Sequence, residues 1–423
     1  MVHSFIENKT SEVYLKAQAC KEASKSFQLC SNQDKNRVLQ TLSNLIIEHQ
    51  EEILENNVID TNNAKNMNFS SSQLDRLLLD VKRIEALSRS VLEIIALDDP
   101  IGEIIETYIR PNGLEIHKKR VPLGVIAIIY ESRPNVTIDA SILCIKTGNC
   151  VILRGGKEAI YTNLYLTTLI KKALLQNNLN PDIVQIIEDT DRKFALELMH
   201  MHQFVDVLIP RGSASLINTV LENSTIPVLE TGVGNCHIYI DDSADINMAK
   251  SIVLNAKLQR PAVCNAVETV LIHKKLLPDF SSNLIRELIE HKVELRVSED
   301  IYQLYPNLKL ATLEDWETEY LDLILAIKSV DSIDEAINHI NEYSSHHSEA
   351  IITSNQEHAK RFMNEIDSAA LYHNASTRFT DGYEFGFEAE IGISTQKLHA
   401  RGPMGLKELT SYKYLIYGDG QIR

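Results

Sequence analysis

Cys264 lies in a local sequence that suits a reactive thiol. Residues 255–258 have a helical pattern, and Pro261 disfavours helix for the residue before it. The apolar run 267–272 then predicts a buried strand. A cysteine at such a helix–loop–strand junction can be held rigidly and still be reached from a cleft, as a thiolate nucleophile requires. A free cysteine is also among the residue types most often buried, so this stretch alone leaves a structural role open.

Two predicted strands end in glycine beside a basic residue and lead into a helix. They are CVILRGGKEA (150–159) and LIPRGSAS (208–215). Backbone N–H groups at a helix N-terminus favour an anion, although the glycines could simply turn the chain. Two such strand ends favour a dinucleotide, even though neither is a GxGxxG fingerprint. At this strand end an acidic residue would suit the free ribose 2′-hydroxyl of NAD. The cations Arg154 and Lys157 stand there instead and suit a 2′-phosphate, so NADP is preferred over NAD.

Three further polar residues are candidates for the chemistry. Asn135, directly after the first buried strand, could donate to an oxyanion or cap the following helix. Glu230, before the glycine turn GVG, could be a general base or bind backbone. Cys236 competes with Cys264 as nucleophile, but it precedes the apolar strand 237–241 and is expected to be a buried structural thiol.

The segment 374–405 is dense in hydroxyls, glycines, aromatics and arginines, a composition typical of binding loops. Ser376, Thr377 and Arg378 could hold an amino-acid carboxylate. The alternative for Arg378 and for Arg401 is structural ion pairing with Asp381, Glu388 or Glu390 of the same segment.

The elements that would position these residues follow a clear order. Residues 1–97 have long helical patterns, and 101–109 and 114–121 predict a hairpin turning at Asn112-Gly113. From residue 121, near-continuous apolar strands alternate with helices, which predicts mostly parallel, doubly wound sheets. In such sheets ligands bind beyond the carboxyl ends of the strands.

Composition excludes several classes of protein. The chain has 423 residues, enough for two domains, and a formal net charge of -16, which disfavours nucleic acid and anionic membranes as partners. It has no apolar run of membrane-spanning length and no signal-peptide pattern. The six cysteines show no zinc-ligand spacing, so we expect no metal and a cytoplasmic protein with reduced thiols.

Long runs of the sequence resemble the gamma-glutamyl phosphate reductase family (glutamate-5-semialdehyde dehydrogenases), within the aldehyde dehydrogenase superfamily. The runs cover essentially the whole chain and include VPLGVIAIIYESRPNVT, VILRGGKEA, LIPRG, ETGVGNCHIYID, QRPAVCNAVET, NASTRFTDG and STQKLHARGPMGL. One departure is Glu388 in FGFEAEIG, where the resemblance leads us to expect glycine.

The resemblance implies an aldehyde-dehydrogenase-like α/β fold with two doubly wound domains and a β-hairpin oligomerisation arm. We expect an NADP-binding domain at 1–227, interrupted by the arm at 99–121. A catalytic domain at 228–400 and a C-terminal segment at 401–423 that joins the arm complete the chain.

The resemblance also assigns roles to individual residues. It implies Cys264 as the nucleophile and Asn135 as the oxyanion donor. For the cofactor it implies Arg154, Lys157, Ser213 and Glu319, and Gly212 belongs to the same strand end as Ser213. From the residue types themselves, the candidates for binding substrate are Arg133, Arg260, Ser376, Thr377 and Arg378.

The implied reaction is NADPH-dependent reduction of L-glutamyl 5-phosphate to L-glutamate 5-semialdehyde, with release of phosphate, in proline biosynthesis. The alternative enzyme is a hydrolytic aldehyde dehydrogenase that uses Glu230 to activate water. The alternative to an enzyme is a catalytically silent scaffold protein. We further expect a homo-oligomer, a dimer or tetramer, and a transient association with glutamate 5-kinase.

Overall fold

A computed structural model describes residues 9–277, 282–387 and 389–423. The chain divides into two compact units. Unit 1 comprises 1–231, 387–392 and 404–423, and unit 2 comprises 232–386 and 393–403. The division after Thr231 falls a few residues beyond the expected boundary at 227. Among the described residues, no helix combines the length and the apolar character that crossing a membrane needs.

Unit 1 begins with helices whose N-termini are capped by side chains. Ser11, Ser31 and Asp80 accept hydrogen bonds from the first turns of α1, α2 and α5, and so satisfy N–H groups that lack a helical partner. The helices are α1 (Glu12–Phe27), α2 (Asn32–Glu48), α3 (Gln50–Asn66), α4 (Ser71–Leu77), α5 (Val81–Ala96), α6 (Asn135–Lys146), α7 (Ile160–Gln176), α8 (Arg192–Leu198) and α9 (Ala214–Asn223).

The described part of unit 1 contains a parallel four-stranded sheet in the order β5-β4-β3-β6. Every residue of β3 is buried, which is why its sequence VIAIIY is apolar throughout instead of alternating. The strands are β3 (Val125–Tyr130), β4 (Cys150–Arg154), β5 (Val184–Ile186) and β6 (Val207–Arg211).

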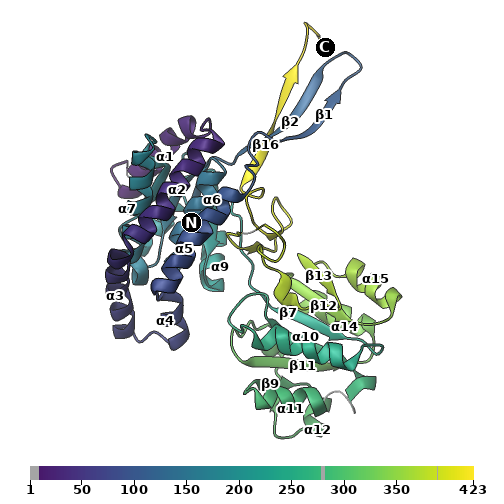
Figure 1. The fold of residues 1–423 in the computed structure, drawn as a ribbon. Coiled ribbons are helices and arrows are strands. Elements are labelled where there is room, and N and C mark those ends of the chain that lie inside the picture. The colour runs from purple at the N-terminus through teal and green to yellow at the C-terminus, as the bar shows by residue number, and fades with distance from the viewer. Residues whose placement is uncertain (1–8, 278–281, 388) are drawn as a thin grey trace, which may run out of the picture. The chain divides into compact units, whose positions relative to one another are not determined.

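A separate antiparallel sheet of unit 1 has the order β1-β2-β16 in the described chain. Its strands are β1 (Ile104–Ile109), β2 (Glu115–Pro122) and β16 (Thr410–Tyr417). The last strand pairs with β2 along its whole length although almost 300 residues separate them, and Figure 1 shows it in yellow beside β2. Large apolar side chains of this sheet are exposed, among them Ile109, Tyr412, Tyr414 and Ile416.

Unit 2 is built on a parallel sheet that, in the described residues, has the order β10-β9-β11-β8-β7-β12-β13. Its strands are β7 (Cys236–Ile240), β8 (Val267–His273), β9 (Glu294–Val297), β10 (Lys309–Leu310), β11 (Ile324–Val330), β12 (Ser348–Ile352) and β13 (Ala370–His373), and a short pair β14 (Ile393–Ser394) and β15 (Gly402–Pro403) lies apart from it. Its helices are α10 (Ile246–Leu258), α11 (Ser282–Glu290), α12 (Glu299–Leu304), α13 (Leu313–Glu317), α14 (Ile333–Tyr343) and α15 (Gln356–Glu365).

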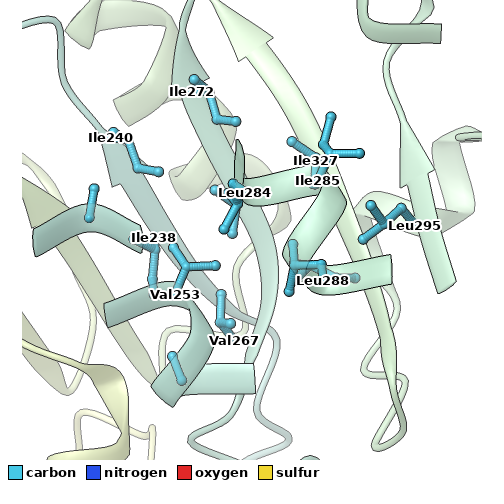
Figure 2. Packing of buried hydrophobic residues seen from close by; sticks show 14 of the residues in the cluster. Ile238, Ile240, Val253, Val267, Ile272, Leu284, Ile285, Leu288, Leu295 and Ile327 are labelled. Carbon is cyan, nitrogen blue, oxygen red and sulfur yellow. The ribbon is translucent and has the colours of Figure 1, made fainter. Parts of the chain in front are cut away.

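Both faces of this sheet are covered by helices. Ile238 and Ile240 of β7 pack with side chains of α10 and α11, as Figure 2 shows. Tyr239, between them, points to the opposite face and packs with α14 and α15. Helices on both faces leave the carboxyl ends of the strands as the place for a ligand.

Candidate active site

In unit 1, three loops meet at the carboxyl ends of neighbouring strands. Because β3 lies between β4 and β6, the loops that follow these strands share one edge of the sheet. The Ser213 N–H donates to Glu131 Oε2 at 2.9 Å, and the N–H and hydroxyl of Ser132 donate to Glu158 Oε1 at 2.6 and 2.8 Å. The structure therefore brings together Arg133, Asn135, Arg154, Lys157, Gly212 and Ser213, all of which the sequence singles out.

The glycines of these loops are required by close packing. A Cβ on Gly155 would lie 2.2 Å from Asn163 Nδ2 and 3.2 Å from the Tyr130 hydroxyl. A Cβ on Gly212 would lie 2.5 Å from Glu131 Oε2. Neither glycine has a positive φ, so a tight turn alone does not explain them. Side chains of the protein itself therefore pack directly against the backbone at both strand ends.

Arg154 offers a positive group at this edge. Its Nη1 and Nη2 donate to the carbonyls of Gly155 (3.2 Å) and Thr190 (2.8 Å). Its buried Nε has no hydrogen-bond partner among the described residues. Burial lowers the pKa of Arg154, although the nearby charges of Glu158 and Glu131 oppose this shift. Lys157, exposed in the next turn, adds a second cation, so the donors fit an anionic group.

Asn135 does not cap α6. Pro134 occupies the N-cap position, so the capping alternative is wrong. The Asn135 side chain donates from Nδ2 to Asp139 Oδ2 at 2.8 Å, one helical turn on. An amide group has two N–H donors, so this bond fixes its orientation and leaves a second donor. Burial raises the pKa of Asp139 to about 6, against the lowering effects of Asn135 and Arg211.

Asp139 makes stability depend on pH in a defined direction. Its pKa in the fold, about 6, exceeds the ordinary 3.8, so the folded state holds the proton more tightly. Its contribution to stability is therefore present at low pH and is lost as pH rises through about 4 to 6. We expect Asp139→Asn to remove roughly 1–2 kcal/mol of this pH dependence. Urea denaturation of both proteins at pH 4.5 and pH 7 checks it, and an equal difference at the two pH values would contradict it.

In unit 2, Cys264 lies in the loop between α10 and β8, as its sequence predicts. It is partly exposed, whereas Cys236 is fully buried, and all six cysteines are thiols. The Cys236 Sγ donates to the Cys264 carbonyl at 3.1 Å. Gly234 lies so close to this carbonyl that a Cβ would sit 1.6 Å from the oxygen. The backbone of Cys264 is thus held on two sides while its side chain stays accessible.

Asn265, the residue after Cys264, is held in place by the turn 376–380. Asn265 Nδ2 donates to the carbonyls of Arg378 (3.3 Å) and Thr380 (2.9 Å), and Thr377 Oγ1 donates to the Asn265 carbonyl at 2.8 Å. The Ser376 hydroxyl accepts from the Arg378 N–H within the same turn. Ser376 and Thr377 are buried; the Thr377 hydroxyl supports the cysteine loop directly, and the Ser376 hydroxyl stabilises the turn itself.

Arg260 and Arg378 lie near the loop that carries Cys264. Arg378 donates from Nε to the Gln259 side chain at 3.1 Å, and Gln259 precedes the exposed Arg260. Burial lowers the pKa of Arg378, and the negative charges of Asp381 and Cys264 oppose that shift. Arg401 instead pairs with Asp367 at 2.7 Å, a partner outside the predicted set, and Glu388 lies outside the described residues.

Glu319 lies beside the cysteine loop, because its Oε1 accepts from the Gly234 N–H at 2.7 Å. Burial raises the pKa of this carboxyl. Below the loop, the buried Lys257 Nζ donates to Glu268 Oε2 at 2.6 Å and to the Val267 carbonyl at 3.1 Å. Of the sequence candidates, the structure of unit 2 thus gathers Arg260, Cys264, Glu319, Ser376, Thr377 and Arg378 around one loop.

Sequence analysis misses several supporting residues. The strand 267–272 contains Glu268, a charge in an apolar run, and this signals the buried partner Lys257. Gly234 and Asp139 carry no comparable signal, because their roles depend on contacts with residues that the sequence does not identify as neighbours.

Gly234→Ala is expected to displace the Cys264 backbone. A change of position of about 1 Å can cost roughly 100-fold in rate, so we expect turnover to fall by roughly 10- to 100-fold. The rate at which iodoacetamide labels Cys264 reports the displacement independently of turnover. A variant with wild-type turnover and labelling would show that the loop accommodates the methyl group elsewhere.

Among the described residues, unit 2 also contains a group of side chains of the types that bind metal ions. Side-chain atoms of Asp241, Asp242 and His358 lie within 4.8 Å of one another. The Asp241 carboxylate accepts from Tyr239 and Thr353, and Asp242 pairs with Lys275. These side chains are therefore already engaged in hydrogen bonds and an ion pair within the chain.

Comparisons with known proteins show the family to which the chain belongs. The family model described as aldehyde dehydrogenase family matches residues 2–303. Gamma-glutamyl phosphate reductase of Caldanaerobacter subterraneus subsp. tengcongensis is 54% identical over 412 residues, 97% of this chain and 100% of the relative. That of Clostridium perfringens (strain 13 / Type A) is 53% identical over 413 residues, 98% of this chain and 100% of the relative.

A solved structure is similar over the same length. The crystal structure of gamma-glutamyl phosphate reductase from Thermotoga maritima matches with a TM-score of 0.95 and 46% identity, covering 98% of this chain and 100% of that one. The predicted aldehyde-dehydrogenase-like α/β fold is therefore confirmed. The chain belongs to the aldehyde dehydrogenase family and, within it, to the gamma-glutamyl phosphate reductases.

Proposed function

We propose that this chain catalyses the NADPH-dependent reduction of L-glutamyl 5-phosphate to L-glutamate 5-semialdehyde, with release of phosphate, in proline biosynthesis. The observation that carries the proposal is the setting of Cys264. Its side chain is partly exposed, and its carbonyl is fixed by Cys236 and Gly234. The relatives that span the chain at more than half identity carry the name of this activity.

Cys264 is the nucleophile in this proposal. Its thiolate adds to the acyl phosphate carbonyl, the C–O bond to phosphate breaks, and a thioester forms on sulfur. A rigid loop favours this step. The hydrogen bonds of Asn265 with Thr377 and Thr380, and the close contact at Gly234, hold the loop in place before the substrate binds. The positive charge of Arg378, which interacts with Cys264, favours the thiolate.

Asn135 is the proposed donor to the oxyanion formed in each addition. Its hydrogen bond to Asp139 fixes the amide plane, and a fixed donor costs little reorganisation during the reaction. One such donor contributes roughly 3–4 kcal/mol to lowering the barrier. Below pH 6 Asp139 takes up a proton, so we place the acid limb of the activity there.

The cofactor would be held at the sheet edge of unit 1. Gly212 and Ser213 would bind its pyrophosphate, and the cations of Arg154 and Lys157 favour the 2′-phosphate of NADP(H) over NAD(H). Glu319 would bind the nicotinamide ribose. When bound, NADPH supplies the hydride that reduces the thioester carbonyl. Cys264 then leaves as thiolate and releases the aldehyde.

The amino-acid end of the substrate needs a positive partner. Arg133, Arg260 and Arg378 are the candidates for its carboxylate, and Ser376 and Thr377 shape the turn that carries Arg378. Glu230 is partly exposed in unit 1 and has no assigned step, because activating water would hydrolyse the thioester.

The β1-β2-β16 sheet is the proposed oligomerisation surface. Its exposed Ile109, Tyr412, Tyr414 and Ile416 would be covered by another copy of the chain in a dimer or tetramer. A transient association with glutamate 5-kinase would protect the labile acyl phosphate. A cytoplasmic location fits six cysteines that are all thiols.

The reverse reaction tests the proposal, because the acyl phosphate is too unstable for a convenient assay. Enzyme, glutamate semialdehyde and NADP are mixed with and without inorganic phosphate while NADPH absorbance is followed. NADP reduction that requires phosphate is the expected result. Reduction without phosphate would mean that water resolves the thioester, as in the hydrolytic alternative. No reduction in either mixture would indicate a catalytically silent scaffold.

A further inference from the structure

The N-terminus of α9 is bound by a carboxylate of the chain itself. The Ser213 N–H donates to Glu131 Oε2 at 2.9 Å. The same oxygen lies over Gly212, since a Cβ there would be 2.5 Å away. The Ser213 hydroxyl faces the other way and accepts from the Leu216 N–H. The N–H of the N-cap residue Ser213, next to the glycine, is thus already bound to an anion.

The Glu131 carboxylate can bind the Ser213 N–H and can also be displaced from it. It follows β3 directly, and its own N–H donates to the Arg211 carbonyl at 3.2 Å, so its backbone is part of the sheet edge. Within the described residues, no lysine or arginine nitrogen comes within 4.0 Å of its carboxylate. The side chain is partly exposed and can turn into water. A backbone N–H bond and the helix dipole hold the carboxylate on α9, and the charge of Arg154 attracts it without direct contact.

We propose that Glu131 is an internal competitor of the cofactor, because its carboxylate holds the anion position at Ser213 and Gly212. This inference rests on the proposed function, in which a pyrophosphate binds there. An incoming phosphate must displace the carboxylate from the Ser213 N–H, and the displaced charge remains on the adjacent strand. Glu131 therefore weakens cofactor binding and favours release of the oxidised cofactor.

Removing the charge tests the inference without turnover. Glu131→Gln keeps the size and an acceptor oxygen, and Glu131→Ala removes the side chain. We expect both variants to bind NADPH roughly threefold to tenfold more tightly than the wild type, measured as Kd by nucleotide fluorescence. Adenosine 2′-monophosphate, which lacks the pyrophosphate, should bind all three proteins equally.

Glu158→Gln is the matched control. It removes an equal charge at the same sheet edge, but the Glu158 carboxylate binds Ser132 and not the α9 N-terminus. If this variant tightened NADPH binding as much as Glu131→Gln, the effect would be one of general charge and the inference would be wrong.

Two other outcomes separate this inference from the proposed function. If the wild type binds NADPH and both Glu131 variants bind it equally or more weakly, Glu131 supports the turn and only the inference fails. If the folded wild type does not bind NADPH at all, the proposed function fails with it. Circular dichroism confirms that each variant is folded before the titrations.

Discussion

Replacing Cys264 by serine is expected to lower turnover by about 1,000-fold or more while NADPH binding stays unchanged. A serine hydroxyl is far less acidic than a thiol, and no other side chain in unit 2 is proposed to supply a nucleophile. Removing the nucleophile of a comparable covalent mechanism costs several orders of magnitude in kcat. The loop itself should survive, because its fixed points are the Cys264 carbonyl and Asn265.

Cys30→Ser is the matched control, since Cys30 is the other partly exposed cysteine and lies in unit 1 between α1 and α2. We expect this variant to keep wild-type turnover. The reverse reaction with phosphate measures turnover, and nucleotide fluorescence measures Kd for NADPH. Near-normal turnover by Cys264→Ser would exclude the thioester, and a parallel loss of NADPH binding would show that the substitution disturbs the fold.

The sequence predicts the sheets and the nucleophile loop well because their signals are local. VIAIIY is apolar throughout and is a fully buried strand, and Pro261 follows the end of α10 as expected. Boundaries that depend on longer contacts are less well predicted. Asn135 has a side chain that could cap a following helix, but α6 itself starts at Asn135, and Pro134 before it makes no side-chain cap bond.

The partners of the site residues are harder to predict. Ser376 and Thr377 have the composition of a substrate loop, yet the Thr377 hydroxyl binds the Asn265 carbonyl more than 100 residues away. Glu131 belongs to a recognised motif, but its carboxylate acts on a turn that follows another strand. Both contacts depend on the order of strands in a sheet, which residue types do not reveal.

The buried pair Lys257–Glu268 gives the second large expected effect. Both side chains are fully buried, at 0% exposure, and their charged atoms are 2.6 Å apart. Removing one partner leaves an uncompensated buried charge, so Lys257→Met is expected to lower the free energy of unfolding by about 3–5 kcal/mol. Urea denaturation measures this loss, with the m-value checking that the transition remains comparable.

Two variants show whether the charge, and not the loss of contacts, causes this effect. Lys274→Met removes a lysine from the exposed pair with Asp331, whose side chains are 45% and 68% exposed, and should cost below about 1 kcal/mol. The double variant Lys257→Met/Glu268→Leu removes both buried charges and should recover most of the loss, because apolar side chains can replace a buried pair. Failure of the double variant to recover stability would assign the loss to packing.

The pH dependence gives an independent check on the same pair. Burial raises the pKa of Glu268 from 4.5 to about 7, although Lys257 opposes the shift. The folded state therefore holds this proton more tightly, and the contribution of Glu268 falls as pH rises from about 4.5 to 7. Without Lys257 the carboxyl loses its cationic partner, so protonation becomes more favourable still and Lys257→Met should lose less stability at pH 6 than at pH 8. Equal losses at both pH values would mean that Glu268 keeps the same protonation state at pH 6 and pH 8, which would contradict a pKa of about 7 for this buried carboxyl.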